Sequence, residues 1–355
     1  MSRTLLIMAG GTGGHIYPGL AVADALRAKD WNVVWLGAPN SMEAELVPKH
    51  GYPMAWVNFT GVRGKGALRL LTLPFTLLRA LGQSFDAMLR HRPDVVLGMG
   101  GYITMPGGLM AALLRRPLVI HEQNSIAGMS NKVLAKIASR VLSGFPDVLV
   151  KSIWCGNPVR ADIAAVAVPE VRYAGRSGKL NVLVVGGSLG AQALNKALPK
   201  ALALLAEAER PNVLHQAGKK HFEAVQKLYA DAKVGAEVRA FLEDMADQYA
   251  KADVVICRAG ALTIAELAAA GVASVLIPFP FAVDDHQTYN ARFLSDKGAA
   301  ILLPQTELSA EKLAQLLHKL TREKLLVMAQ AARSLAKPDA TAQVVQVCEL
   351  LGEAA

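Results

Sequence analysis

The stretch TLLIMAGGTGGHIYPGLA, from Thr4 to Ala21, decides the fold of this 355-residue chain. An apolar run of strand length leads into a loop with four glycines between Gly10 and Gly14, and apolar residues at helical spacing follow. Glycines let a ligand approach the main chain, and the N–H groups at the start of a helix favour negative charge. The alternative is a tight turn that binds nothing.

The same pattern returns about half a chain later in LNVLVVGGSLGA, Leu180 to Ala191. Other short apolar runs, such as DVVLGMG, PLVIHEQ, VVICRAG and SVLIPFP, alternate with helix-period segments. This alternation is typical of parallel sheets covered by helices. We therefore predict an α/β protein of two doubly wound, Rossmann-like domains, with ligands at the carboxyl ends of the strands in a cleft that both domains face.

The predicted domain boundary lies in WCGNPVR, Trp154 to Arg160, where a glycine and a proline interrupt the pattern. We expect an N-terminal domain of residues 1–159 and a C-terminal domain of residues 160–339. A last helix, residues 340–355, is expected to pack back on the first domain. The apolar stretch Leu267 to Val283 contains Gly271 and two prolines, which favours a helix end, a buried strand and a loop over a membrane-spanning helix.

The net charge of +9 and the pI of about 9.5 indicate an anionic partner. Nucleic acid is disfavoured as that partner, and we expect none, since no binding module is recognisable and aromatic residues make up only 6%. Three distant cysteines fit neither a disulfide framework nor a zinc site, and no export signal precedes the first strand. We expect a cytoplasmic protein.

A nicotinamide dehydrogenase is the first rival interpretation, and its fingerprint fails here. Gly11 and Gly13 start a G-x-G-x-x-G pattern, but its third glycine falls on Ile16. The second strand ends without the acidic residue that would bind a ribose. No Gly-Lys-Ser/Thr completes a phosphate-binding loop either.

Seven motifs in order, GGTGGHxxPGLA, GMGGY, HEQN, GNPVR, GGSxGA, RAGAxTxxE and DDHQxxNA, closely resemble the MurG family. The resemblance implies a GT-B glycosyltransferase that moves N-acetylglucosamine from UDP-N-acetylglucosamine to lipid I, the undecaprenyl-linked muramyl-pentapeptide. The product is lipid II, formed with inversion and with no cofactor or metal. A GT-B transferase with another acceptor and a non-catalytic sugar-nucleotide-binding adaptor remain alternatives.

The resemblance assigns roles to residues of the first domain. His15 is a candidate base for the acceptor hydroxyl, because a helix N-terminus favours its neutral form, and Glu122 is the other candidate. Each has a plain structural alternative: His15 could merely orient the turn, Asn124 could form an Asx turn, and Tyr102 could be a core residue. The family places Thr12, Gly13, Gly14 and Asn124 near the donor, and Tyr102 and His121 near the acceptor.

In the second domain Arg160 and Ser188 resemble ligands of the diphosphate, and Glu266 resembles the residue that accepts hydrogen bonds from the ribose. The alternative for Glu266 is a capping box with Thr263. For Gln287, expected to bind donor sugar hydroxyls, an aspartate N-cap in DDHQ is compatible, and a metal site lacks further ligands. The remaining assignments are Leu242, Ala261, Leu262, Thr263, Ile264 and Ala265 toward the donor, and Asn195 toward the acceptor.

A basic and apolar segment runs from Gly61 to Arg92 with a single acid, Asp86. Such a segment can lie in an anionic headgroup layer, and the family works at the cytoplasmic face of the bacterial inner membrane. We therefore expect peripheral binding to an anionic membrane surface. An ordinary core helix with a solvated face explains the same residues.

Overall fold

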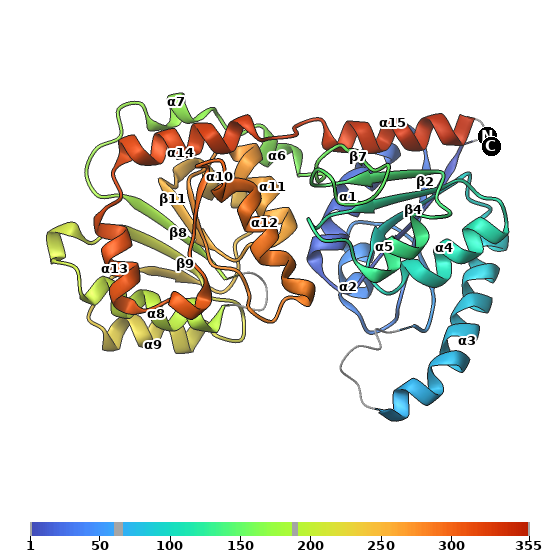
Figure 1. Ribbon diagram of the computed structural model, residues 1–355, viewed down its shortest axis with the longest axis horizontal. Helices are drawn as coiled ribbons and strands as arrows, with labels where there is room; N and C mark the ends of the chain where they lie inside the picture. The colour runs from blue at the N-terminus through green and yellow to red at the C-terminus, as the bar shows by residue number, and fades with distance from the viewer. Residues whose placement is uncertain (1, 60–66, 187–190, 354–355) are drawn as a thin grey trace. The chain divides into compact units, whose positions relative to one another are not determined.

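The computed structural model describes residues 2–59, 67–186 and 191–353, with side chains from residue 72 onward in the second range. The chain forms two compact units (Figure 1). The first comprises Met1–Arg160 and Pro338–Ala355, and the second comprises Ala161–Lys337. The two doubly wound parallel domains predicted from the sequence are confirmed.

The first unit contains a seven-stranded sheet in the order β3-β2-β1-β4-β5-β6-β7. All neighbouring strands are parallel, and β1 lies between β2 and β4, so the order reverses at the β1/β4 pair. A reversal of this kind opens a crevice at the carboxyl ends of the two strands. The strands are β1 (Thr4–Ala9), β2 (Asn32–Gly37), β3 (Met54–Trp56), β4 (Val95–Gly100), β5 (Leu118–Glu122), β6 (Arg140–Ser143) and β7 (Ile153–Trp154).

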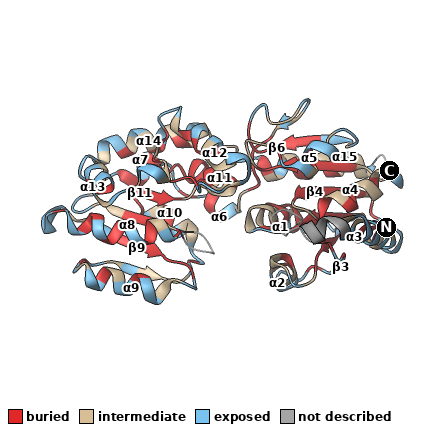
Figure 2. Ribbon diagram, turned by 60° about the horizontal axis from the view of Figure 1, so that its bottom comes forward, coloured by how far each residue is buried: buried red, intermediate tan, exposed pale blue. Residues whose placement is uncertain are grey.

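Helices cover both faces of this sheet because β1 is apolar on both. Leu5 and Ile7 enter the core beneath α1 and α15, whereas Leu6 and Met8 enter the core beneath α3, α4 and α5. Figure 2 shows the strands as buried and the outer helix faces as exposed. The helices are α1 (Gly13–Arg27), α2 (Met42–Lys49), α3 (Ala67–His91), α4 (Thr104–Leu113), α5 (Met129–Leu134) and α15 (Ala340–Glu353).

The second unit repeats the plan with six parallel strands in the order β10-β9-β8-β11-β12-β13. Its reversal lies between β8 and β11. The strands are β8 (Asn181–Val185), β9 (Asn212–Gln216), β10 (Glu237–Arg239), β11 (Val254–Cys257), β12 (Ser274–Leu276) and β13 (Ala300–Leu302). The helices are α6 (Ala161–Ala164), α7 (Pro169–Tyr173), α8 (Gln192–Ala203), α9 (Phe222–Asp231), α10 (Met245–Lys251), α11 (Ala261–Ala270), α12 (His286–Ser295), α13 (Ala310–His318) and α14 (Arg322–Ser334), with short 3-10 turns at Glu207–Glu209, Val283–Asp285 and Gln305–Glu307.

A buried carboxylate organises the base of the second sheet. Asp253 is fully buried and pairs with Arg176 at 2.7 Å and with Arg322 at 3.1 Å. It also accepts the backbone N–H of Asn181, at the start of β8, at 2.8 Å. A buried charge is tolerated only when it is paired in this way. The cluster therefore fixes the start of α14 and the chain before β8 next to the start of β11.

The apolar stretch from residue 267 to 283 resolves into the three elements expected of it. α11 ends at Gly271, whose left-handed φ of 61° closes the helix, and β12 and a loop follow. Among the helices of the described part of the chain, none has the length and apolar character needed to cross a membrane.

Two glycine loops touch at the β1/β4 reversal. Gly101 has a φ of +89°, and a Cβ atom there would lie 2.3 Å from the carbonyl oxygen of Gly10. The backbone N–H of Gly10 in turn points to the carbonyl oxygen of Gly100 at 3.4 Å. The contact is therefore main chain against main chain, which no other residue type at position 101 permits.

We predict that Gly101→Ala destabilises the first unit, by about 1–3 kcal/mol from backbone strain alone. The exposed Gly82 in α3 has no heavy atom within 4 Å of its missing Cβ, so Gly82→Ala is the control and should raise stability by about 0.5–1 kcal/mol. Urea unfolding of both variants measures the difference. Equal stabilities would show that the loop contact is not tight.

Candidate functional site

A buried glutamate holds the first glycine loop in place. Glu43 of α2 is fully buried, and its carboxylate accepts the N–H of Gly11 at 3.1 Å and the N–H of Ala38 at 3.2 Å. Gly10 leaves room for it, since a Cβ there would lie 2.6 Å from Oε1 of Glu43. The carboxylate thus ties the loop after β1 to the loop after β2.

Tyr102 lies beside this carboxylate. Burial first, and then the negative charge and hydrogen bond of Glu43, raise the pKa of Tyr102 to about 12. The hydroxyl therefore stays protonated at neutral pH and donates to Glu43. Its ring also approaches Gly11 and Phe59, the latter at 6.4 Å between centroids. Tyr102 joins the second glycine loop to the first.

The first turn of α1 is open to an anion. Thr12 is the N-cap in an extended conformation, and its side chain makes no capping hydrogen bond. The N–H groups of Gly13 and Gly14 belong to the first turn, where a helix has no internal acceptors. A diphosphate oxygen is the kind of group that such N–H donors bind.

His15 stands in this first turn and is partly exposed. Its Nδ1 lies 2.9 Å from Oε1 of Gln123, directly after β5. Nε2 of Gln123 lies 3.1 Å from Nδ1 of His121, and Nε2 of His121 lies 2.9 Å from the carbonyl oxygen of Gly156. His121 is fully buried, and burial lowers its pKa to about 4. His121 therefore lies behind His15 and not at the surface where an acceptor would touch it.

Glu122 is almost wholly buried and has four hydrogen-bond donors. Oε1 accepts from the backbone N–H and the side chain of Asn124, at 3.0 and 3.4 Å. Oε2 accepts from the N–H of Gly128 at 3.0 Å and from Asn131 at 2.9 Å. This set of bonds folds the loop between β5 and α5. The geometry thus gives Glu122 the task of shaping the loop that carries Asn124, and it favours His15 as the base.

In the second unit the loop after β11 leads into α11, whose N-cap is Gly260. Thr263 is therefore inside the first turn, and the capping-box alternative does not apply. Glu266 accepts a hydrogen bond from the hydroxyl of Tyr249 at 3.0 Å. The other residues of α11 assigned to the donor, from Ala261 to Ala265, lie in its first turns, and Leu242 is buried after β10.

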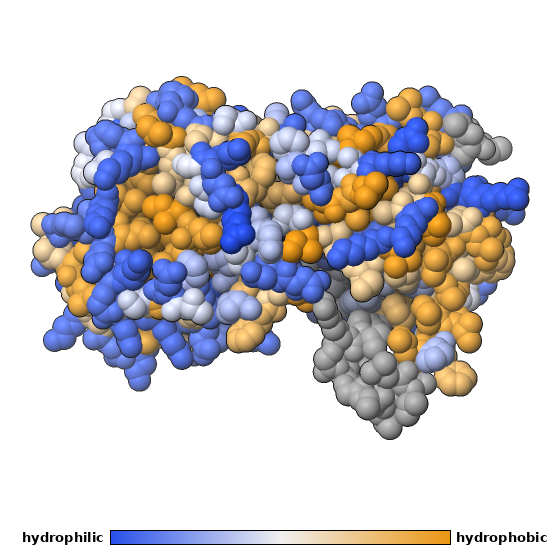
Figure 3. All heavy atoms as spheres, viewed as in Figure 1, coloured by the Kyte–Doolittle hydropathy of each residue, from blue (hydrophilic) through white to orange (hydrophobic). Residues whose placement is uncertain are grey.

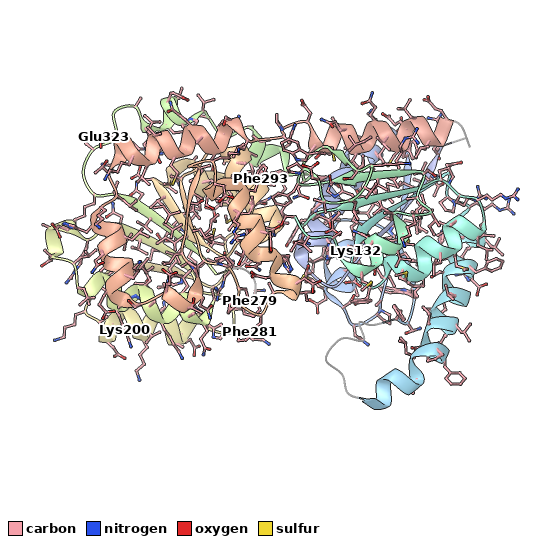
Figure 4. All side chains as sticks on the ribbon, viewed as in Figure 1. Lys132, Lys200, Phe279, Phe281, Phe293 and Glu323 are labelled. Atoms are coloured by element: carbon pink, nitrogen blue, oxygen red, sulfur yellow. The ribbon has the colours of Figure 1, made fainter. Side chains whose placement is uncertain are left out.

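The loop after β12 is aromatic. Phe279 and Phe281 are exposed and pack edge to face with ring centroids 5.6 Å apart (Figure 4). The guanidinium of Arg258 lies 5.5 Å from the Phe279 ring. Gln287, at the start of α12, accepts the N–H of Phe279 at 2.9 Å, so its amide nitrogen is directed away from that bond. These contacts place an amide, a cation and two rings at the carboxyl edge of the sheet.

Three further assignments concern Arg160, Asn195 and Ser188. Arg160 is the last residue of the first of the two segments that form the first unit, and it is partly buried. Asn195 is buried in α8, where it bonds the carbonyl of Ala217 at 3.2 Å and Nε2 of His215 at 3.0 Å. Such a position suits a core residue of the second unit better than an acceptor contact. Ser188 lies outside the described residues.

Sequence reasoning missed Glu43, Gln123 and the pair Phe279 and Phe281. Gln123 lies inside the HEQN motif, but an amide has no acid–base chemistry that would mark it as a functional residue, unlike His121 and Glu122. Glu43 had no signal, since an acid in a first helical turn is ordinary. Within the described residues no cluster of three or more histidines, cysteines and acids could hold a metal ion.

Comparison with known proteins identifies the relatives of both units. The glycosyltransferase family 28 N-terminal domain matches residues 5–143, and the glycosyltransferase family 28 C-terminal domain matches residues 181–344. A protein of Aromatoleum aromaticum is 63% identical over 349 residues, 98% of each chain. A protein of Dechloromonas aromatica is 60% identical, over 98% of this chain and 99% of its own. Both are named UDP-N-acetylglucosamine–N-acetylmuramyl-(pentapeptide) pyrophosphoryl-undecaprenol N-acetylglucosamine transferase.

Solved structures agree with this result. The crystal structure of Acinetobacter baumannii MurG is 42% identical with a TM-score of 0.85, over 98% of this chain and 99% of that one. The calicheamicin glycosyltransferase CalG4 is 16% identical with a TM-score of 0.67, over 99% and 98% of the two chains, and shares the fold alone. The resemblance to the MurG family and the GT-B fold are confirmed.

The bonds of Glu43 predict the effect of neutralising it. In Glu43→Gln the amide nitrogen faces donors that a carboxylate oxygen accepted, so we expect a loss of about 1–3 kcal/mol in the free energy of unfolding. Glu45 is exposed on the same helix, and Glu45→Gln is the matched control, with a change within about 0.5 kcal/mol. Chemical denaturation of the two variants tests this, and equal effects would argue against the role of Glu43.

Proposed function

The chain belongs to glycosyltransferase family 28, and on that premise we propose that it transfers N-acetylglucosamine from UDP-N-acetylglucosamine to lipid I, giving lipid II. The observation that carries the proposal is the 63% identity, across 98% of both chains, to a transferase named for this reaction. The HEQN, GGTGGH and RAGALTIAE sequences support it, because their residues form the contacts described above.

We assign the donor chiefly to the second unit. Glu266 accepts from the ribose hydroxyls, the main chain near Leu242 and Ala261 borders the uracil, and Gln287 bonds the sugar. Phe279 donates its N–H to Gln287, and the exposed rings of Phe279 and Phe281 offer an apolar surface to the sugar ring. Arg160 and the first-turn N–H groups of α1 are suited to the charge that develops on the departing diphosphate.

His15 is the proposed base. The 4-hydroxyl of the muramyl sugar forms a bond to the anomeric carbon of N-acetylglucosamine as the bond from that carbon to the diphosphate oxygen breaks. The hydroxyl proton passes to the imidazole of His15, and UDP leaves with the electron pair of the broken bond. A well-placed base of this kind contributes about 10²–10⁴-fold to the rate.

We expect His15→Ala to lower kcat for UDP release by about 10²–10⁴-fold while UDP-N-acetylglucosamine still binds. The assay supplies the donor with and without a soluble lipid I analogue. The control is His50→Ala, which changes an exposed histidine of the same unit.

Acceptor-dependent UDP release by the native chain supports the function. Full activity of His15→Ala would remove His15 as the base, and donor binding with no product from this analogue would favour another acceptor. Stabilisation by NADH but not by the UDP-sugar would favour a dehydrogenase.

We further propose that α3 binds the cytoplasmic face of the inner membrane through anionic lipids. Phe75 is 75% exposed and Leu78 is 66% exposed, one helical turn apart on the same side. Arg79 is exposed beside them. Figure 3 shows apolar residues gathered over α3 and α4. An aromatic ring, an aliphatic side chain and a cation on one helix suit the boundary between acyl chains and anionic headgroups, where the lipid-linked acceptor would be reached.

The double variant Phe75→Ser with Leu78→Ser should bind vesicles containing phosphatidylglycerol at least tenfold more weakly, since each buried side chain contributes about 1.5–3 kcal/mol. Val327→Ser removes a similarly exposed apolar residue from α14 and is the control. Vesicle flotation measures both. Unchanged binding by the double variant would exclude this surface.

A further inference from the structure

A row of three side chains connects His15 to a backbone carbonyl inside the first unit. Gly156 O, His121, Gln123 and His15 follow one another at 2.9, 3.1 and 2.9 Å. His121 and Gln123 are 0% and 1% exposed, so water does not compete for these bonds. His15 at the end of the row is the only one of the three that is partly exposed.

The direction of the proton donors in this row follows from its inner end. The carbonyl oxygen of Gly156 can only accept, so Nε2 of His121 carries the hydrogen. Burial lowers the pKa of His121 to about 4, and the ring therefore holds a single proton at neutral pH. Nδ1 of His121 then carries no hydrogen and can only accept. The group of Gln123 that faces it must therefore be the amide NH₂. The same NH₂ also bonds the carbonyl of His121 at 3.2 Å.

The position of the proton on the His15 ring follows from the orientation of the Gln123 amide. With its NH₂ turned inward, Gln123 presents its amide oxygen to Nδ1 of His15, and an amide oxygen accepts only. Nδ1 of His15 must carry the hydrogen, which leaves the lone pair of the neutral ring on Nε2. The absence of a side chain at Gly100 leaves room for the His15 ring, because a Cβ there would lie 2.7 Å from Nδ1 of His15. Asn157 fixes the main chain of Gln123 by donating to its carbonyl at 3.0 Å.

We propose that Gln123 and His121 are positioning residues that hold His15 in the Nδ1–H tautomer, so that Nε2 is the atom that takes the acceptor proton. This inference rests on the proposed function for its catalytic consequence, while the tautomer itself is a property of the protein alone. A carboxylate in place of Gln123 would also fix the ring, but it would add a negative charge next to the base. The amide fixes the tautomer without that charge.

The test is the imidazole ¹⁵N spectrum of histidine-labelled protein, with the His15 signals assigned by their loss in His15→Ala. We expect Nδ1 of His15 to show the shift of a protonated nitrogen and Nε2 that of an unprotonated one. In Gln123→Met the acceptor is gone, and the ring should move toward the Nε2–H form that free histidine favours. In Gln123→Glu a carboxylate oxygen still accepts from Nδ1, so the native tautomer should persist.

Steady-state kinetics distinguish a positioning role of Gln123 from a general loss of structure. Gln123→Met should lower kcat roughly ten- to a hundredfold with the KM for UDP-N-acetylglucosamine within about twofold of native, and Gln123→Glu should recover part of the loss. Gln216→Met, at a buried glutamine in the second unit, is the control for the cost of the exchange. A native spectrum with hydrogen on Nε2, or a Gln123→Met protein with native tautomer and kcat, overturns the proposal. The expected tautomer in a protein that transfers no sugar supports the proposal and contradicts the proposed function alone.

Discussion

The contact between the two glycine loops of the first unit is the constraint on which the rest of the site depends. Gly101 lies against the carbonyl of Gly10, and Gly100 lies against the ring of His15. Both glycines have φ near +90°, so the second loop bends back toward the first only because neither carries a side chain. The bend places Tyr102 beside Glu43, and it leaves space for the His15 ring beside Gln123. The positions of Tyr102 beside Glu43 and of His15, the proposed base, beside Gln123 thus depend on one close approach.

In the HEQN motif, neighbouring residues at the end of β5 have different roles. Successive residues of an extended strand point to opposite sides, so His121 and Gln123 extend one way and Glu122 the other. On one side His121 and Gln123 form the row to His15, and on the other Glu122 collects donors from the loop that carries Asn124. The carboxylate of Glu122 is therefore engaged in hydrogen bonds that shape the loop, and the neutral amide of Gln123 beside it contacts His15, the proposed base.

The two units use one plan for different chemistry. Each sheet reverses its strand order beside its first strand, and its assigned residues lie at or after the ends of its first, fourth and fifth strands, except Leu242, which follows β10, and Arg160, which follows β7. In the first unit those loops carry small residues, an imidazole and buried acids. In the second they carry Glu266, Gln287 and two exposed phenylalanines, groups suited to a nucleotide and a sugar. The calicheamicin glycosyltransferase CalG4 shares the fold at 16% identity, so the fold itself does not require a close likeness of sequence.

The sequence by itself determined the fold class, the two-domain plan, the family and the strands β1, β4, β8 and β11, because these strands are apolar runs followed by glycine or a helix start. It did not show β9, where a buried His215 is satisfied by Asn195 and Tyr229 and interrupts the apolar pattern. Only the tertiary structure decided what the polar residues of the site do. Gln123 meets His15 across 108 residues of sequence, and Glu43 meets Gly11 across 32. Local patterns record which face of an element is buried, whereas the partner of a buried polar group depends on which strands the sheet places side by side.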